Sequence, residues 1–265
     1  MELLTWAHFV EFCSVLFVGS IIVSSWLLVP PIIRPQVITY PWRMPESYEY
    51  RERDKGRTVV LAGSFNPPHF GHLAMLEYLS KRYGQVIVVT GVNPKKTYQV
   101  TPQQRVELLR KMLENRNLTK NVRVEGTSEF FCIFACLQDH LILLFFCFLP
   151  VYAAYIWRFA KSQNATIFFR GIRSWEKDGK EERTLQILNT WGPLLYGPLY
   201  WPIPTIYLEG KPEYNHISST LIRDLSKDIG KKASEHVEQS LQELVPPEVA
   251  NEVALLYSPE AKKTS

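Results

Sequence analysis

The sequence predicts an α/β fold in which helices cover both faces of a parallel β-sheet, with an additional apolar helix at the N-terminus. Short apolar runs alternate with amphipathic segments of helical period between residues 58 and 257. The first of these runs ends at Gly63, as a buried parallel strand would. The N-terminal stretch Phe12–Ile33, in contrast, contains no charged residue.

The predicted strands and helices follow one another in a regular order. Thr58–Ala62 is a short apolar run of the kind that forms a buried strand. Gly71–Tyr83 has apolar residues at helical spacing, and Thr101–Leu113 begins with the Thr-Pro pair that is typical of a helix start. Together they indicate a Rossmann-like sheet. The other predicted strands are Gln85–Val92, Asn121–Glu125, Ala165–Phe169 and Ile203–Leu208, and the other predicted helices are Tyr155–Ser162 and Ser218–Lys227.

Composition excludes several classes of protein. The chain has 265 residues, of which 46% are hydrophobic and 13% aromatic, so it is not mainly disordered, and its length suits one domain with an appendage. A net charge of +4 is too small to indicate a nucleic-acid partner and suits anionic small molecules equally well. No metal site is predicted, because Cys132, Cys136 and His140 lack the common spacings of zinc ligands.

The N-terminal residues 1–33 form a hydrophobic segment that predicts a membrane anchor. Phe12–Ile33 is about as long as the roughly 20 residues that cross a bilayer as a helix. Acidic rather than basic residues precede it, which argues against a secretory signal peptide, and arginines follow it. The positive-inside rule then places the rest of the chain in the cytosol. The alternatives are a cleaved presequence or a misassigned start codon, with a cytoplasmic or organellar protein. Residues 34–57 show neither the helical nor the strand spacing of apolar residues and are predicted to be a linker.

The string GSFNPPHFGH, residues 63–72, follows the first predicted strand and is the first candidate site. Its glycines let the backbone approach a phosphate closely, and Ser64 offers a hydroxyl and an amide. His69 and His72 are three residues apart at a predicted helix N-terminus, so their rings can point to the same side as the free N–H groups. We therefore expect an anion site here.

Three further strings place basic or hydroxyl side chains after predicted strands. Lys95 lies in NPKK, Arg170 and Arg173 lie in RGIR, and the string ISSTLIR, residues 217–223, opens a predicted helix. Because ligands collect at the carboxyl ends of parallel strands, we expect these groups to converge on one site. A Lys-Lys pair can equally be solvated surface and Arg170 can be structural, so the prediction depends on the ordered set.

These strings resemble the two signatures of the nucleotidyltransferase superfamily, G-x-F-x-P-x-H-x-G-H and I-S-S-T-x-I-R. The chain is similar to phosphopantetheine adenylyltransferases over residues 58–128 and 151–257. The motifs that carry this similarity are NPKK, TPQQRVE (101–107), RGIR before an acidic run, and PEYNHISST (212–220). The resemblance implies that residues 58–257 form a nucleotidyltransferase domain. It implies transfer of AMP from ATP to 4′-phosphopantetheine, with Mg²⁺, to give dephospho-coenzyme A and pyrophosphate in coenzyme A synthesis.

The resemblance also implies roles for individual residues. His72 would hydrogen-bond the α-phosphate of ATP, Lys95 would span the two reacting phosphates, and Arg170 would bind the acceptor phosphate. Such groups offset the repulsion between two polyanions, and a phosphate dianion needs no strong general base. Ser64 would contact the phosphate of pantetheine. The positions implied for ATP binding are Gly63, Ser64, Phe65, His69, His72, Arg173, Glu181, Ser218, Ser219, Thr220 and Arg223.

Two departures from the bacterial pattern leave the acceptor open. Asn66 stands where an Asp is common, and His69 stands where a Thr or Ser is common. Both make the string similar to nicotinate- or nicotinamide-mononucleotide adenylyltransferases, whereas RGIR with its acidic run favours phosphopantetheine. A third hypothesis is a membrane-tethered, nucleotide-binding pseudoenzyme. The presence of His72, Lys95, Arg170 and Ser218 argues against it. A homo-oligomer is compatible with the sequence, and no nucleic-acid partner is expected.

The string Glu129–Pro150 is an apolar insert where the resemblance implies only a short link. A second membrane crossing would separate His72 from Arg170 and place Asp139 in the bilayer at a cost of roughly 3 kcal/mol. The remaining alternatives are an interfacial hairpin and a translated intron. We hypothesise the intron, because the resemblance is clean on both sides; an abundant transcript that retains codons 129–150 would exclude it.

Overall fold

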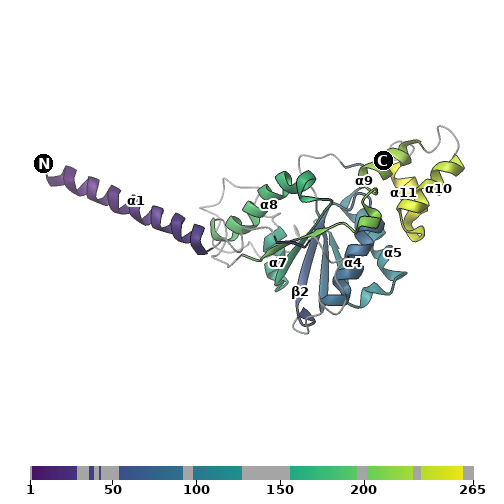
Figure 1. Ribbon diagram of the computed structural model, residues 1–265, viewed down its shortest axis with the longest axis horizontal. Helices are drawn as coiled ribbons and strands as arrows, with labels where there is room; N and C mark the ends of the chain where they lie inside the picture. The colour runs from purple at the N-terminus through teal and green to yellow at the C-terminus, as the bar shows by residue number, and fades with distance from the viewer. Residues whose placement is uncertain are drawn as a thin grey trace, which may run out of the picture. The chain divides into compact units, whose positions relative to one another are not determined.

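A computed structural model describes most of the chain, in two units that are described separately here (Figure 1). The first unit spans Met1–Pro35 and the second spans Gln36–Ser265. The described residues are 2–28, 36–38, 42, 54–91, 98–126, 156–195, 202–228 and 234–258.

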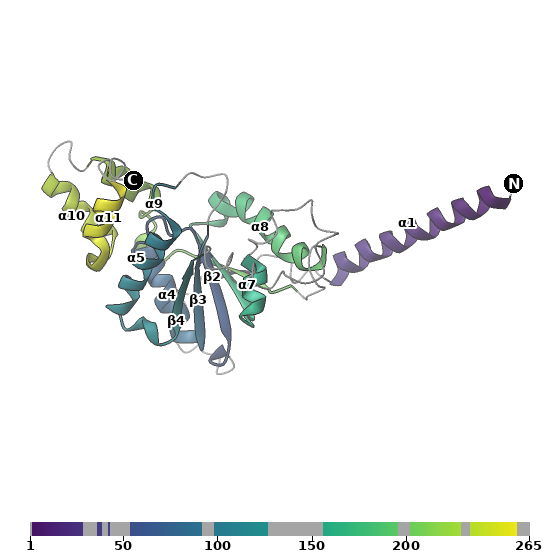
Figure 2. The ribbon, with the colours of Figure 1, turned by 180° about the vertical axis from the view of Figure 1, so that it is seen from behind.

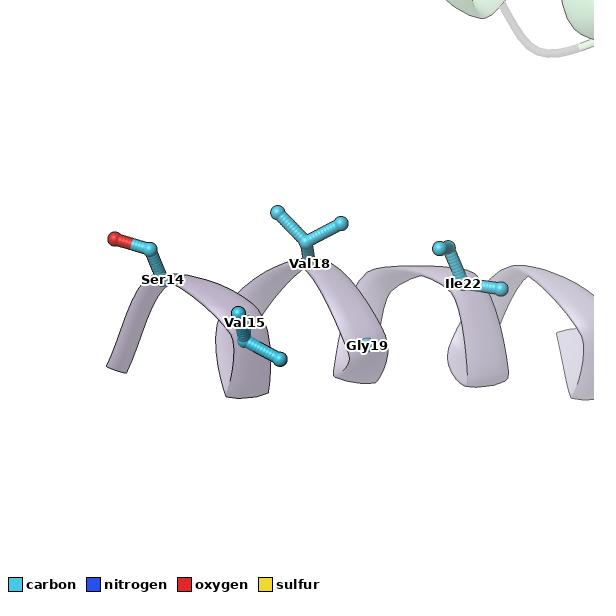
Figure 3. Close-up of a pocket in the computed structure, with 5 residues that line it drawn as sticks. All are labelled: Ser14, Val15, Val18, Gly19 and Ile22. Carbon is cyan, nitrogen blue, oxygen red and sulfur yellow. The ribbon is translucent and has the colours of Figure 1, made fainter. Parts of the chain in front are cut away.

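The N-terminal unit consists of one helix, α1 (Glu2–Leu28). Large apolar side chains along it are exposed, among them Trp6, Phe12 and Phe17. Figure 3 shows the side chains of Val15, Val18 and Ile22 projecting from this helix. Within the part of the chain that the structure describes, no helix combines the length and the hydropathy needed to span a membrane. The predicted transmembrane anchor is therefore not supported.

The second unit is built on a six-stranded, all-parallel sheet with the strand order β1-β6-β5-β2-β3-β4, so the predicted parallel α/β fold is confirmed. In the register of the central strands, Ala62 lies opposite Arg170 and Gly63 lies opposite Thr90. The carboxyl ends of the strands consequently share one edge. The strands are β1 (Gln36–Ile38), β2 (Thr58–Gly63), β3 (Gln85–Thr90), β4 (Val122–Gly126), β5 (Ile167–Ile172) and β6 (Thr205–Glu209).

Helices cover both faces of this sheet, as predicted (Figures 1 and 2). Successive strand residues point to opposite faces, so Leu61 packs with the helices α4 and α5, whereas Val60 packs with α7. Both side chains are almost fully buried. The helices of this layer structure are α4 (Phe70–Arg82), α5 (Pro102–Glu114), α7 (Ile156–Ser162) and α8 (Trp175–Leu195).

Three C-terminal helices form a further buried cluster with the outer faces of α4 and α5. These are α9 (Ser219–Asp228), α10 (Ser234–Leu244) and α11 (Pro247–Tyr257), which lie side by side in both views (Figures 1 and 2). Ile222 of α9 and Val253 of α11 are fully buried with Leu108 of α5 in this cluster. The chain beyond the sheet is therefore part of the same packed unit.

Residues 36–38, within the predicted linker, form the edge strand β1 beside β6. Trp42 reinforces this edge, since its indole N–H donates to the carbonyl oxygen of Glu209 at 3.0 Å and its ring packs on Tyr78. A strand of three residues is too short to show a period, which is why the sequence did not indicate it. The apolar insert 129–150 lies outside the described residues.

Candidate active site

The loop between β2 and α4, residues 63–69, lies at the carboxyl edge of the sheet. It turns sharply at Phe65, whose φ of 45° is in the left-handed region. The ring of Phe65 then lies against Gly63, where an added Cβ would come within 2.8 Å of the ring. Gly63 is therefore required for packing inside the loop, a reason that differs from the close approach of phosphate predicted from the sequence.

Side chains from distant elements hold the backbone carbonyl groups of this loop and of the strand before it. Because these carbonyl groups already accept hydrogen bonds from the protein, the loop has a fixed backbone shape before any ligand arrives. Arg170, Ser219 and Arg223, three of the predicted site residues, thus meet around one loop. The bonds run from Arg170 Nη1 to Ala62 O (3.0 Å), Arg105 Nη1 to Ser64 O (2.6 Å), Arg223 Nη1 to Asn66 O and Ser219 Oγ to Pro67 O (2.8 Å).

The two histidines of the loop stack at the start of α4. Their ring centroids are 3.8 Å apart, and Nδ1 of His69 accepts the backbone N–H of Gly71, so His69 is the N-cap of the helix. Nδ1 of His72 is buried without a hydrogen-bond partner among the described residues. Burial lowers the pKa of His72 to about 4, and burial with the neighbouring His72 lowers the pKa of His69 well below its usual value. Both rings are therefore neutral at pH 7.

Arg170 forms a bidentate salt bridge with Glu182 of α8, with N–O distances of 2.6 and 3.0 Å. The carboxylate of Glu182 is almost fully buried, and the Tyr207 hydroxyl donates to the Glu182 carbonyl oxygen at 3.2 Å. Such a pair fixes the plane of the guanidinium group, whose remaining edge is directed by the bond to Ala62. Arg170 is thus held rigidly at the end of β5.

The sequence prediction missed Glu182 and named its neighbour Glu181, whose side chain lies outside the described part of the structure. Glu182 shares a buried helix face with Gln186, four residues later. This spacing of polar residues was the signal available in the sequence. Lys95 also lies outside the described residues, so the structure does not place it.

Arg173 lies after β5 and pairs with Asp178 in the first turn of α8. Its guanidinium group and its backbone N–H donate to the Asp178 carboxylate at 2.6 and 2.8 Å. Partial burial opposes ionisation of Asp178, but the hydrogen bonds and charge of Arg173 outweigh it and lower the pKa of this carboxyl group. Most of the Arg173 side chain is exposed to solvent, in contrast to Arg170.

The start of α9 carries the remaining predicted residues. The Oγ atom of Ser218 accepts the N–H of Leu221 at 3.1 Å, and Arg223 Nη2 donates to Thr220 Oγ1 at 3.0 Å. The helix N-terminus is therefore capped by Ser218 and joined to the β2–α4 loop by Ser219 and Arg223. Its partial positive charge lies beside the loop.

Arg105 of α5 is a second residue that the sequence prediction missed. Its side chain is fully buried, and Nη1 donates to Ser64 O at 2.6 Å and to Gly91 O at 3.2 Å, which joins the ends of β2 and β3. Its Nη2 has no hydrogen-bond partner, and no carboxylate of the described residues pairs with it. An arginine within the apolar stripe of Val106, Leu109 and Leu113 was the signal for it.

In the described ranges, no group of three or more His, Cys, Asp or Glu side chains could hold a metal ion. The site instead gathers guanidinium groups, hydroxyl groups and neutral imidazoles around one loop. Such a set binds phosphate oxygens rather than a bare cation. The arrangement therefore suits a reaction between phosphate groups.

Comparison with known proteins found several similar proteins. Phosphopantetheine adenylyltransferase of Aquifex aeolicus is 27% identical over 191 residues, which covers 71% of this chain and 96% of that protein. The enzyme of the same name from Chromobacterium violaceum is 28% identical over 202 residues, which covers 76% of this chain and 98% of that protein. The structure of Plasmodium falciparum nicotinic acid mononucleotide adenylyltransferase complexed with NaAD aligns with a TM-score of 0.46 and 14% identity, over 76% of this chain and 96% of that one.

Residues 60–225 match the family described as cytidylyltransferase-like. This segment contains the β2–α4 loop, Arg105, the Arg170–Glu182 pair and the start of α9. The matched segment and the adenylyltransferase relatives agree with the phosphate chemistry of the site. The chain therefore belongs to the cytidylyltransferase-like family and is an enzyme of the adenylyltransferase type.

Proposed function

We propose that this enzyme transfers AMP from ATP to 4′-phosphopantetheine, giving dephospho-coenzyme A and pyrophosphate in coenzyme A synthesis. The observation that carries the proposal is the β2–α4 loop, around which Arg170, Ser219 and Arg223 converge from three elements. The relatives named for this acceptor, which the alignments cover over 96% and 98% of their own length, support the choice of substrate.

In the proposed reaction, a phosphate oxygen of phosphopantetheine attacks the α-phosphorus of ATP. A new P–O bond forms, the bond from the α-phosphorus to its bridging oxygen breaks, and pyrophosphate leaves with that oxygen and its electron pair. The acceptor phosphate is mostly dianionic near pH 7, so the enzyme has mainly to bring two polyanions together and stabilise the charge between them.

The described residues divide this task between them. Arg170, held by Glu182, would bind the acceptor phosphate, and the exposed Ser64 would contact the same group. His72 would donate one N–H to the α-phosphate as a neutral imidazole, because its pKa of about 4 leaves it uncharged at pH 7. The start of α9 would face the triphosphate. These donors would act most strongly on charge that develops in the transition state.

Three further residues and Mg²⁺ complete the proposal. Lys95 would span the two reacting phosphates, and Glu181 and Arg173 would lie near the nucleotide. Mg²⁺ would be bound by the phosphates of ATP, since the described side chains offer cations and hydroxyl groups rather than a carboxylate cage. Its role would be to offset the negative charge of the triphosphate.

The two departures that favoured a pyridine mononucleotide make contacts inside the protein. Asn66 is only 7% exposed and its Oδ1 accepts the hydroxyl of Tyr257, while His69 caps α4. These contacts account for Asn66 and His69 without a pyridine mononucleotide as the acceptor.

The proposal is tested with the full chain, ATP and Mg²⁺, with pyrophosphate release as the readout. Rapid release is expected with 4′-phosphopantetheine, and none above background with nicotinate or nicotinamide mononucleotide. Turnover with a pyridine mononucleotide alone would overturn the acceptor assignment. A folded protein that binds ATP but turns over with no acceptor would indicate the pseudoenzyme.

A further inference from the structure

We propose that Tyr257, the last residue of α11, is a positioning residue that fixes the β2–α4 loop through Asn66. The hydroxyl of Tyr257 donates to Oδ1 of Asn66 at 2.6 Å, a contact between residues 191 positions apart in the chain. Tyr257 lies outside the segment 60–225 that matches the family. The inference rests on the proposed adenylyltransferase activity for its kinetic test only.

The hydrogen bond between Tyr257 and Asn66 is isolated from water. Tyr257 is 1% exposed and Asn66 is 7% exposed, so neither polar atom can exchange its partner for solvent. Burial raises the pKa of the Tyr257 hydroxyl, although the nearby charges of Arg105 and Arg223 act in the opposite direction. The hydroxyl therefore stays protonated, and remains a donor, at neutral pH.

Asn66 is fixed from two sides by two C-terminal helices. Its side chain is bound by Tyr257 of α11, and its backbone carbonyl is bound by Arg223 of α9. Asn66 lies in the chain between Ser64 of the loop and His72 of α4, both of which are proposed to contact the reacting phosphates. A shift of Asn66 would move both contacts at once.

The ring of Tyr257 has a separate structural role that can be kept constant. It packs in the apolar cluster with Leu108, Met112 and Val253, all of which are fully buried. Replacement of Tyr257 by Phe keeps these ring contacts and removes only the hydroxyl group. The variant Tyr257→Phe therefore isolates the hydrogen bond to Asn66 from the packing of α11.

We expect Tyr257→Phe to lower kcat by about tenfold and to change KM for ATP by less than about threefold, because loss of alignment weakens the transition state more than the ground state. The matched control is Tyr78→Phe. Tyr78 lies in the C-terminal half of α4, away from the β2–α4 loop, and its ring packs on Trp42. This control should leave kcat unchanged. A kcat within about twofold of the wild type for Tyr257→Phe would overturn the inference.

A double-mutant cycle tests the route through Asn66. If Tyr257 acts through that side chain, Tyr257→Phe should have no further effect on kcat in an Asn66→Ala background. Equal losses in both backgrounds would contradict the inference. The cycle uses whichever acceptor turns over, so an error in the acceptor assignment does not affect it.

Hydrogen exchange supplies a readout that needs no turnover. Peptides that cover residues 63–72 should exchange faster in Tyr257→Phe than in the wild type, while peptides from β3 and α5 should be unchanged. Unchanged exchange in the loop would overturn the inference. Faster exchange throughout the C-terminal helices would assign the residue a structural role alone.

Discussion

Two arginines hold the β2–α4 loop and the end of β2, the partly buried Arg170 of β5 and the fully buried Arg105 of α5, and their charges are compensated differently. Arg170 holds Ala62 O and is paired with the buried carboxylate of Glu182. Arg105 holds Ser64 O, and no carboxylate of the described residues pairs with it. A guanidinium group is thus used in two ways: Arg170 is oriented by a fixed counter-charge, whereas Arg105 is held by two carbonyl groups and lies 4.6 Å from the centroid of the Tyr98 ring.

Arg170→Met should have the largest effect, because it leaves the Glu182 carboxylate buried without a partner. We expect the free energy of unfolding to fall by about 3–5 kcal/mol at pH 7, measured by urea denaturation. Arg173→Met is the matched control, since the Arg173 side chain is largely exposed and its pair with Asp178 should contribute about 0–1 kcal/mol. Equal losses of unfolding free energy in the two variants would show that the Arg170–Glu182 pair stabilises the fold no more than the Arg173–Asp178 pair does.

Because the pKa values of His69 and His72 are low in the folded protein, we expect the protein to lose stability in mild acid. The pKa of His72 is about 4 in the folded protein and about 6.5 in the unfolded chain, so the unfolded chain binds the proton first as the pH falls. The contribution of His72 should destabilise the fold progressively between pH 6.5 and 4, by roughly 3 kcal/mol, and level off below that range. His69 acts in the same direction.

The same measurement with His72→Gln should show a shallower decline across this range, because one of the two titrating rings is gone. Denaturation curves at half-unit pH intervals would measure the difference. Parallel curves for the wild type and the variant would contradict the assignment of a lowered pKa to His72.

Arg105→Met should reduce stability less than Arg170→Met does, because it leaves no buried carboxylate without a partner. It leaves two neutral carbonyl groups, Ser64 O and Gly91 O, without their donor, which should cost about 1–3 kcal/mol. Activity should nevertheless fall by about tenfold or more, because the backbone of Ser64 is released. A loss of stability as large as that of Arg170→Met would show that a carboxylate pairs with Arg105 after all.

The sequence predicted the parts of the site that depend on local pattern. The glycines, histidines and hydroxyl groups of the two signatures lie at strand-to-helix turns, and turns of a parallel sheet meet at one edge. The partners of these residues could not be read in the same way. Glu181 and Glu182 are adjacent, but successive residues of a helix point about 100° apart, so only the packing of α8 decides which one meets Arg170. Tyr257 is far from Asn66 in the chain, and no periodicity links them.

The proposed enzyme transfers AMP from ATP to 4′-phosphopantetheine, and the reverse reaction tests this proposal most directly. The full chain is incubated with dephospho-coenzyme A, Mg²⁺ and labelled pyrophosphate, and labelled ATP is measured. We predict labelled ATP only when dephospho-coenzyme A is present, with a rate about 100-fold lower in His72→Ala and an unchanged unfolding midpoint at pH 7. Labelled ATP from nicotinic acid adenine dinucleotide instead, or an unchanged rate in His72→Ala, would contradict the account.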